Sequence, residues 1–233
     1  GISVDFVGNP LLGEVRAELT PAEFRLQNNI RPDAPLIGIM PGSRRQEIAR
    51  LLPLFLETAA MLHREIEKGV FLLPLASTLS EDDVTLHGGK YARQLDIRVI
   101  KKDRYTAMAA CNAAMAASGT LTMELAILGV PMVVCYRLAA LTYLLAKPFI
   151  KVQSASLVNL VAGREVVPEL LQKRATPAHI HREIVPLLQS GPARETMRQE
   201  LARVCTMLGR PGASSRTADI AMEMLGAGAA PDG

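Results

Sequence analysis

The sequence predicts an α/β fold, a doubly wound parallel sheet followed by a helical C-terminal region. Short apolar runs alternate with helical patterns up to about residue 135, and the connections between them are short. Aromatic residues make up 4% of the chain and Trp is absent, whereas Ala, Leu and Val are abundant. These features favour helices packed on a parallel sheet over a β-sandwich, because buried parallel strands read as continuous apolar runs.

Five apolar runs have the length of buried strands. They cover residues 36–40, 70–75, 97–100, 113–117 and 132–135. Helical patterns separate them at 46–67, 83–94, 105–110 and 121–128, which is the alternating order of a Rossmann-like sheet. Further helices are expected at 21–27, 177–188, 193–208 and 214–225, and a strand is expected at 3–7.

Composition limits the class of partner. The chain is 49% hydrophobic and 21% charged, so it can build a core and is not disordered. A net charge of +3 does not indicate a nucleic-acid groove, although it allows an anionic ligand or a membrane surface. Cys111, Cys135, Cys205 and the four histidines lack metal-site spacing. We therefore expect no metal or cofactor, and free thiols in a reducing compartment.

A strand, a tight turn, a helix and a second strand follow one another in the middle of the chain. Ser118, Gly119 and Thr120 form the turn, and the first N–H groups of the helix attract an anion such as a phosphate. The hydroxyls of Ser118, Thr120 and Thr122 add donors, and Glu124 is placed to accept hydrogen bonds from sugar hydroxyls. The alternative is that Ser118 or Thr120 merely caps the helix and that Glu124 is a solvated surface residue.

A second candidate ligand loop, Pro-Gly-Ser-Arg, follows the strand at 36–40. Such a loop lies at the carboxyl end of a strand, where open α/β sheets bind ligands. Ser43 is expected to cap the next helix and Glu47 to support it. Arg44 is a fixed cation that suits a diphosphate. Its charge opposes the helix dipole, which favours a role in binding over a purely structural one.

Two segments after the sheet have open interpretations. Residues 138–150 are nearly all apolar with basic edges and are too short to span a bilayer. They form either a buried helix or an apolar surface that faces lipid. In residues 156–172, Asn159, Arg164 and Glu169 form either a ligand wall or an ordinary capped loop. Neither a GxGxxG fingerprint after a strand nor a Walker A motif occurs.

Five motifs, in order along the chain, resemble one family. They are VDFVGNPLL at 4–12, MPGSRRQEI at 40–48, ASGTLTMELAILGVPMVVCYR at 117–137, SLVNLVAGREVVPELLQ at 156–172 and GAS at 212–214. Together they resemble lipid-A-disaccharide synthase, a GT-B glycosyltransferase of family 19, over residues 4–225. The resemblance implies one half of a GT-B fold, in which two Rossmann-like domains face each other across a cleft.

The resemblance also implies a domain organisation. Residues 1–30 would be a remnant of the N-terminal domain and the interdomain connection, 31–172 the Rossmann-like nucleotide-binding domain, and 173–233 C-terminal helices with a flexible tail. Because the chain begins without Met and inside an expected strand, we expect the natural start to be missing. The general base is expected in the N-terminal half, so the isolated chain is expected to be inactive.

The implied reaction transfers 2,3-diacylglucosamine from its UDP donor, UDP-2,3-diacylglucosamine, to 2,3-diacylglucosamine 1-phosphate. It gives lipid A disaccharide 1-phosphate and UDP, inverts the anomeric centre and needs no metal. Both substrates are lipids, which implies a cytoplasmic protein bound peripherally to the inner face of the bacterial inner membrane. A homodimer is a further expectation, and no nucleic-acid partner is expected.

The matching motifs imply the role of each residue. Arg44 would be catalytic by holding the leaving diphosphate, with Ser43 beside it. Ser118, Gly119, Thr120 and Thr122 would supply donors at the helix start, and Glu124 would hold the ribose hydroxyls. A second group is expected at the sugar or along the cleft wall: Tyr136, Arg137, Asn159, Arg164 and Glu169.

The chain departs from the family pattern at three positions. Asn9 stands where the family has His, Val158 replaces Pro, and Asn112 stands where Asp is common. Two other functions stay open. One is another GT-B enzyme that uses a UDP-sugar, such as a soluble acetylglucosaminyltransferase or an epimerase. The other is a non-catalytic nucleotide-binding domain.

Overall fold

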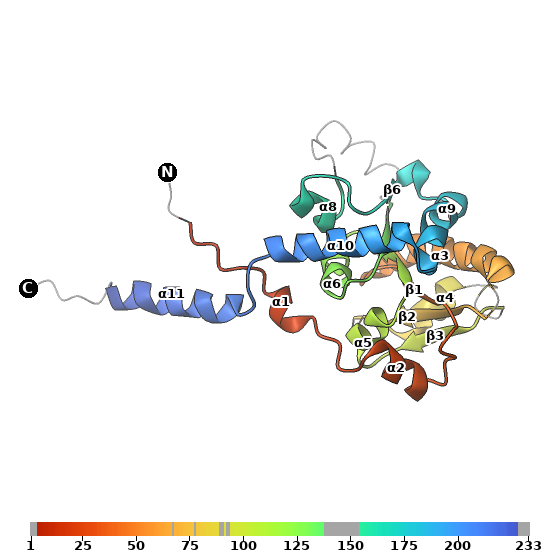
Figure 1. The fold of residues 1–233 in the computed structure, drawn as a ribbon, viewed down its shortest axis with the longest axis horizontal. Coiled ribbons are helices and arrows are strands. Elements are labelled where there is room, and N and C mark those ends of the chain that lie inside the picture. The colour runs from red at the N-terminus through yellow and green to blue at the C-terminus, as the bar shows by residue number, and fades with distance from the viewer. Residues whose placement is uncertain are drawn as a thin grey trace, which may run out of the picture.

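A six-stranded parallel sheet forms the centre of the computed structural model, which describes residues 4–66, 68–76, 78–88, 91, 94–137 and 154–227. The strand order is β3-β2-β1-β4-β5-β6, and every neighbouring pair is parallel (Figure 1). The strands are β1 (Leu36–Met40), β2 (Val70–Pro74), β3 (Ile97–Ile100), β4 (Ala113–Ala117), β5 (Met132–Tyr136) and β6 (Glu169–Leu171). The predicted doubly wound parallel sheet is confirmed.

The two central strands are buried on both faces. Every residue of β1 and β4 is buried, which explains the uninterrupted apolar sequences LIGIM and AAMAA. The sheet order changes direction between these strands, because β2 and β3 lie on one side of β1 while β5 and β6 lie beyond β4. In open α/β sheets, the carboxyl edge at such a switch point is where ligands bind.

Helices cover both faces of the sheet. On one face, α3 (Arg45–Glu65) packs against α4 (Glu81–Gly88) and α9 (Pro177–Leu188). On the other face, α2 (Pro21–Gln27) packs against α5 (Arg104–Ala109), and α10 (Pro192–Met207) packs against α6 (Thr120–Ile127) (Figure 1). The remaining described helices are α1 (Leu11–Glu14), α8 (Leu157–Ala162), α11 (Ala213–Ala227) and a 3-10 turn at Gln172–Arg174. The predicted helical C-terminal region is therefore present.

Local sequence sets the start of several helices. The hydroxyls of Thr20, Ser156 and Thr176 each accept a hydrogen bond from the backbone N–H three residues further on. Pro21 and Pro177 occupy the first position of their helices, where a missing N–H costs nothing. Capping by Ser and Thr followed by Pro thus explains why α2 and α9 begin at the predicted residues.

The predicted strand at 3–7 is wrong over its described part. Residues 4–7 are irregular, and Val4 and Phe6 are exposed. A strand needs a neighbour to satisfy its backbone groups, and no described strand pairs with this segment. The Val7 carbonyl instead accepts hydrogen bonds from the Arg216 guanidinium of α11.

Four short elements were not predicted: α1, α8, β6 and the 3-10 turn at Gln172–Arg174. β6 adds a sixth strand at the edge of the sheet beside β5, and α8 occupies part of the segment that was interpreted as a ligand wall or a loop. β6 has three residues and begins with a charged one directly after Pro168. A run with only two apolar residues is too short to give the signal that marks a buried strand.

Other boundaries differ by small amounts. The helix predicted at 83–94 begins at Glu81 and ends at Gly88, where two glycines follow one another in the sequence. The apolar segment 138–150 lies outside the described residues. Among the helices that are described, none has both the length and the hydropathy needed to cross a membrane.

Candidate functional site

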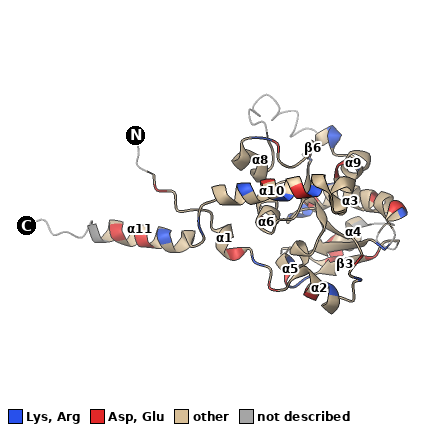
Figure 2. Ribbon diagram, in the orientation of Figure 1, with Lys and Arg blue, Asp and Glu red and all other residues tan. Residues whose placement is uncertain are grey.

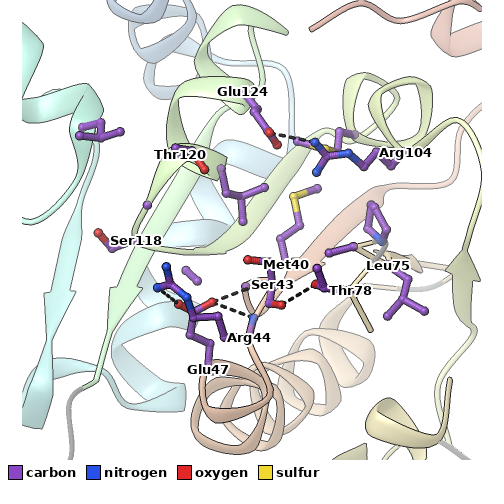
Figure 3. A pocket seen from close by; sticks show the side chains of 18 of the residues that line it. Met40, Ser43, Arg44, Glu47, Leu75, Thr78, Arg104, Ser118, Thr120 and Glu124 are labelled. Carbon is purple, nitrogen blue, oxygen red and sulfur yellow. Dashed lines mark hydrogen bonds and ion pairs between the residues drawn. The ribbon is translucent and has the colours of Figure 1, made fainter. Parts of the chain in front are cut away.

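A cavity of about 820 Å³ opens at the carboxyl edge of the sheet, next to the β1–β4 switch point. Its walls come from the connections that follow β1, β2, β3 and β4, together with residues beside α8 (Figure 3). The lining residues include Ser43, Arg44, Thr78, Lys101, Asp103, Arg104, Ser118, Gly119, Thr120 and Glu124. The two predicted ligand loops therefore meet at one site, although Arg44 and Gly119 are 75 positions apart in the chain.

The start of α6 forms one wall of this cavity. Gly119 is the N-cap residue, with φ 145° and ψ −162°, a region that is almost restricted to glycine. No heavy atom lies within 4 Å of the position where a Gly119 Cβ would be, so the backbone is open to a ligand. No side chain caps α6, so the alternative that Ser118 or Thr120 is the cap is wrong.

The hydroxyls around this turn have different roles. Thr120 is exposed and lines the cavity. The Ser118 hydroxyl donates to the Ala155 carbonyl at 2.7 Å, so it ties the turn to the segment before α8. Thr122 is fully buried and does not line the cavity, and its hydroxyl donates to the Gly119 carbonyl at 2.8 Å. The expectation that Thr122 supplies a donor to the ligand is therefore wrong.

The β1–α3 turn forms the opposite wall. The Glu47 carboxylate accepts hydrogen bonds from the N–H groups of Ser43 and Arg44, so Glu47 performs the capping. Arg44 is the N-cap residue, and the prediction that Ser43 caps α3 is wrong. The Arg44 side chain is 82% exposed and pairs with Glu47 at 3.2 Å. An exposed pair of this kind is worth little, so the guanidinium can exchange Glu47 for a ligand.

Glu124 is the buried carboxylate of the site, and the alternative that it is a solvated surface residue is wrong. Its side chain is 9% exposed, and Oε1 accepts a hydrogen bond from Arg104 Nη2 at 2.9 Å (Figure 3). Oε2 is buried and accepts no hydrogen bond from the described residues. Since an unsatisfied buried carboxylate oxygen is costly, Oε2 is an acceptor that a ligand hydroxyl would satisfy.

Asn159 and Glu169 are structural rather than part of the cavity wall. The Glu169 carboxylate accepts from the N–H groups of Ala155 and Ser156, the Ser156 hydroxyl and Asn159 Nδ2, at 2.6–3.0 Å. Asn159 is buried, and its Oδ1 accepts from the N–H groups of Val166 and Val167. Neither side chain lines the cavity. This network holds the backbone of Ala155 in place, and Ala155 does line the cavity.

The other second-group residues also lie outside the cavity. Arg164 pairs with Glu200 of α10. Tyr136 is at the end of β5 and is 37% exposed. The Arg137 guanidinium donates to the Ala175 carbonyl and faces a separate hollow of about 570 Å³ beside α3. The predicted sugar or cleft wall built from these residues is not found in this cavity.

Sequence reasoning missed the contribution of the β2 and β3 connections. Thr78, Lys101, Asp103 and Arg104 all line the cavity. Their sequences carry no recognisable motif, but their position after strands is the signal that pointed to Arg44 and Gly119. Lys101 pairs with Glu81 at 2.9 Å with both side chains more than half exposed, so it is a second exchangeable cation at the rim.

The chemistry of the cavity suits an anion that also carries hydroxyl groups. Arg44, the open N-terminus of α6 and Lys101 provide positive potential, and Glu124 provides a buried acceptor. In the part of the chain that the structure describes, no cluster of three or more His, Cys, Asp and Glu residues is arranged to hold a metal ion. In the view of Figure 2, residues of both charges are interspersed along the described helices.

Comparison with known proteins places the fold and the family. The sheet and its switch-point cavity define a Rossmann-like domain of the class found in GT-B glycosyltransferases. The model of the lipid-A-disaccharide synthetase family matches residues 1–224, and the chain belongs to that family. It is 40% identical over 225 residues to lipid-A-disaccharide synthase of Nitrosococcus oceani and 41% identical over 226 residues to that of Geobacter metallireducens. These matches cover 97% of the chain but only 57% and 58% of the relatives.

Solved structures share the fold at low sequence identity. UDP-GlcNAc 2-epimerase from Neisseria meningitidis, bound to UDP-GlcNAc, aligns over 93% of this chain and 54% of its own, with a TM-score of 0.61 and 13% identity. WaaG, a glycosyltransferase involved in lipopolysaccharide biosynthesis, aligns over 91% of this chain and 54% of its own, with a TM-score of 0.54 and 12% identity. In both cases the chain corresponds to about half of a larger protein.

Proposed function

We propose that this chain supplies the UDP-binding half of a lipid A glycosyltransferase. The transferase would move 2,3-diacylglucosamine from UDP-2,3-diacylglucosamine to 2,3-diacylglucosamine 1-phosphate, giving lipid A disaccharide 1-phosphate and UDP. Family membership supports the reaction. The observation that carries the nucleotide site is the single cavity that joins the open start of α6 to the buried, unsatisfied Oε2 of Glu124.

The start of α6 and Arg44 bind the diphosphate in this proposal. The backbone N–H groups after Gly119 point outward from a helix start, and the helix dipole favours the phosphate charge there. Arg44 turns from Glu47 to the diphosphate and balances the negative charge that grows on it as the glycosidic bond breaks. Stabilising the leaving group in this way requires no metal, which fits the inverting, metal-independent reaction that we propose.

Glu124 binds the ribose. Its Oε2 accepts hydrogen bonds from the ribose hydroxyls, and a charged acceptor makes these stronger than neutral hydrogen bonds. The burial of the carboxylate increases the selectivity of the contact, because a ligand without these hydroxyls leaves Oε2 unsatisfied. Ser43, Ser118 and Thr120 complete the walls between the diphosphate and the edge of the cavity.

The acceptor and the general base belong to the remainder of the protein in this proposal. We assign residues 1–30 to the interdomain connection, 31–172 to the nucleotide-binding domain and 173–233 to the C-terminal region. The isolated chain then binds UDP without transferring sugar. Because both substrates are lipids, the whole protein works as a peripheral protein on the cytoplasmic face of the inner membrane, where two copies pair as a homodimer.

A second candidate function is another reaction of a UDP-sugar. The fold shared with the epimerase bound to UDP-GlcNAc favours it as an alternative, since the same nucleotide half serves different chemistries. Assays of the full-length protein separate the two. The lipid enzyme requires acylated donor and acceptor dispersed in detergent, whereas an epimerase converts UDP-GlcNAc alone.

The nucleotide site is tested by calorimetric titration of UDP into the 233-residue chain. We expect Arg44→Ala and Glu124→Ala each to weaken binding about ten-fold or more, since a charge-assisted contact is worth about 1.5–3 kcal/mol. Arg45→Ala is the matched control, because this neighbouring arginine is similarly exposed, pairs with Asp83 and lies outside the cavity. If UDP binds and neither variant weakens its binding, the assignment is wrong. The assignment is also wrong if neither the chain nor the full-length protein binds UDP.

A further inference from the structure

We propose that Arg104 is a positioning residue that holds the Glu124 carboxylate through Oε1 and leaves Oε2 as an unpaired acceptor at the cavity wall, and that it thereby sets the preference for ribonucleotides over 2′-deoxyribonucleotides. The inference rests on the proposed function, because it takes Glu124 to be the ribose acceptor. It adds a residue that no motif in the sequence marks, located 20 positions before Glu124 on a different helix.

Arg104 and Tyr105 both hold the same oxygen of Glu124. Arg104 Nη2 lies 2.9 Å from Glu124 Oε1 and 2.6 Å from the Tyr105 hydroxyl, which itself lies 3.4 Å from Oε1. The guanidinium carbon also lies 4.4 Å from the centre of the Tyr105 ring, a cation–π distance. All the described donors thus converge on Oε1, and Oε2 is left for the ligand.

Tyr105 contributes as a neutral donor. Burial raises the pKa of the Tyr105 hydroxyl, and the nearby charge of Glu124 raises it further. The hydroxyl therefore keeps its proton at neutral pH and can donate it to Oε1. Together the two side chains restrict the carboxylate to one orientation, so that less rotamer entropy is lost when a ligand binds.

The position of Arg104 is not explained by the stability of its own helix. It is the first residue of α5, where a positive charge opposes the helix dipole. The preceding residue, Asp103, adopts a left-handed conformation with φ 51° and ψ 44°, which is uncommon for a residue other than glycine. Both residues line the cavity, and backbone strain of this kind is concentrated at functional sites.

The side chains of Arg104 and Glu124 are buried to different extents. The Arg104 side chain is 37% exposed and the Glu124 side chain is 9% exposed, so the carboxylate has lost far more of its hydration than the guanidinium. A buried carboxylate needs a charged partner to offset its lost hydration. The same pairing reduces the repulsion between Glu124 and an anionic ligand in the cavity. Orientation and charge compensation therefore both depend on Arg104.

The test compares the affinities of UDP and 2′-deoxyuridine diphosphate by calorimetry. We expect the wild-type chain to prefer UDP by about ten-fold, the value of one hydrogen bond to a charged group. Arg104→Ala should weaken UDP binding by about ten-fold and reduce the preference to below about two-fold. Arg104→Lys, which keeps a cationic donor, should retain part of the UDP affinity and part of the preference for UDP. In a Glu124→Ala background, Arg104→Ala should cause little further loss, because the two residues act as a unit.

Arg98→Ala is the control, since this arginine also forms a partly buried pair, with Asp96 at 3.1 Å, but does not line the cavity. It should leave both affinities unchanged. An unchanged ratio of UDP to deoxy-UDP affinity in folded Arg104→Ala overturns the inference and leaves the nucleotide site in place. If Arg104→Ala fails to fold, the ratio of UDP to deoxy-UDP affinity is measured in Arg104→Gln instead, and the same outcome applies. If neither the wild-type chain nor the full-length protein binds UDP, the proposed function itself is wrong.

Discussion

Gly119 is a residue of the site whose backbone conformation is nearly restricted to glycine. We expect Gly119→Ala to lower the free energy of unfolding by about 1–3 kcal/mol, because its conformation is nearly exclusive to glycine. Urea denaturation checks this value. Since the added methyl group meets no other atom, the cost reports the backbone alone.

Gly13 in α1 provides the matched control for this change. A Cβ at Gly13 also meets nothing within 4 Å, and Gly13 lies in a helix without a positive φ. Gly13→Ala is expected to be neutral or to stabilise by up to about 1 kcal/mol. Equal destabilisation by both changes would show that the Gly119 conformation is not the cause.

The buried thiols give a prediction for pH dependence. Burial raises the pKa of Cys111 and of Cys135 to about 12 from an ordinary value of 9.0. Both thiols stay protonated in the folded protein at pH 8, so we expect iodoacetamide to label them only after unfolding. The two buried thiols make their full contribution to the free energy of unfolding below about pH 9. This contribution is lost as the pH rises towards 12, because the thiols ionise in the unfolded chain but not in the folded protein over that range. Denaturation followed from pH 8 to 11 measures this loss, and Cys111→Ala or Cys135→Ala should reduce its pH dependence.

At the scale of elements, Glu169 of β6 joins the edge of the sheet to α8. We expect Glu169→Ala to lower the free energy of unfolding by about 2–4 kcal/mol, because it leaves several buried donors around Ser156 unsatisfied. UDP affinity should fall as well, since the Ala155 carbonyl that anchors Ser118 belongs to the same segment. Denaturant melts and titrations of this variant should be compared with Glu165→Ala, an exposed glutamate nearby that should change neither quantity.

The centre of the sheet was predictable because β1 and β4 are buried along their whole length. Runs such as AAMAA at β4 have no surface interpretation, so apolar content alone located five strands. β6 was not predictable, since its pairing depends on β5 and on the Glu169 network rather than on its own three residues. The strand predicted at 3–7 is wrong because an apolar pattern does not make a strand without a neighbour, and no described strand pairs with this segment.

The meeting of the two predicted loops followed from their position after strands. Arg44, Gly119 and Glu124 all line one cavity, and their roles in binding stay predictions. Asn159 and Glu169 have the residue types of a ligand wall, but they satisfy buried backbone groups instead. Sequence alone does not distinguish these roles, because both need a polar side chain in an apolar frame. Arg104 was missed because its contact with Glu124 depends on how α5 and α6 lie in space.

At the scale of the whole molecule, Arg216 joins the two ends of the described chain. Its guanidinium donates to the carbonyls of Val7, Arg210 and Pro211 at 2.7–3.1 Å. The N-terminal segment and the start of α11 therefore lie side by side although they are more than 200 residues apart in sequence (Figure 1). The Asn9 N–H also donates to the Leu208 carbonyl at 2.9 Å, which extends the contact.

We expect Arg216→Ala to release this contact while the sheet stays intact. Hydrogen exchange should accelerate at Asn9 and in the first turn of α11, and the exchange of β1 and β4 amides should be unchanged. Arg210→Ala is the control, because the Arg216 contact uses only the backbone carbonyl of Arg210. Faster exchange throughout the sheet would instead show that Arg216 contributes to global stability.

The switch in strand order between β1 and β4 has a consequence for how the protein folds. β1 to β3 and β4 to β6 are each continuous in sequence, whereas β1 and β4 meet through residues 76 positions apart, as in the contact of Leu36 with Asn112. Closing so long a loop is slow, so the two halves are expected to assemble separately before they join. Arg44 belongs to the first half, and Gly119 and Glu124 belong to the second. The cavity thus exists only after the last step of assembly, so a bound nucleotide would hold the two halves together and slow their separation.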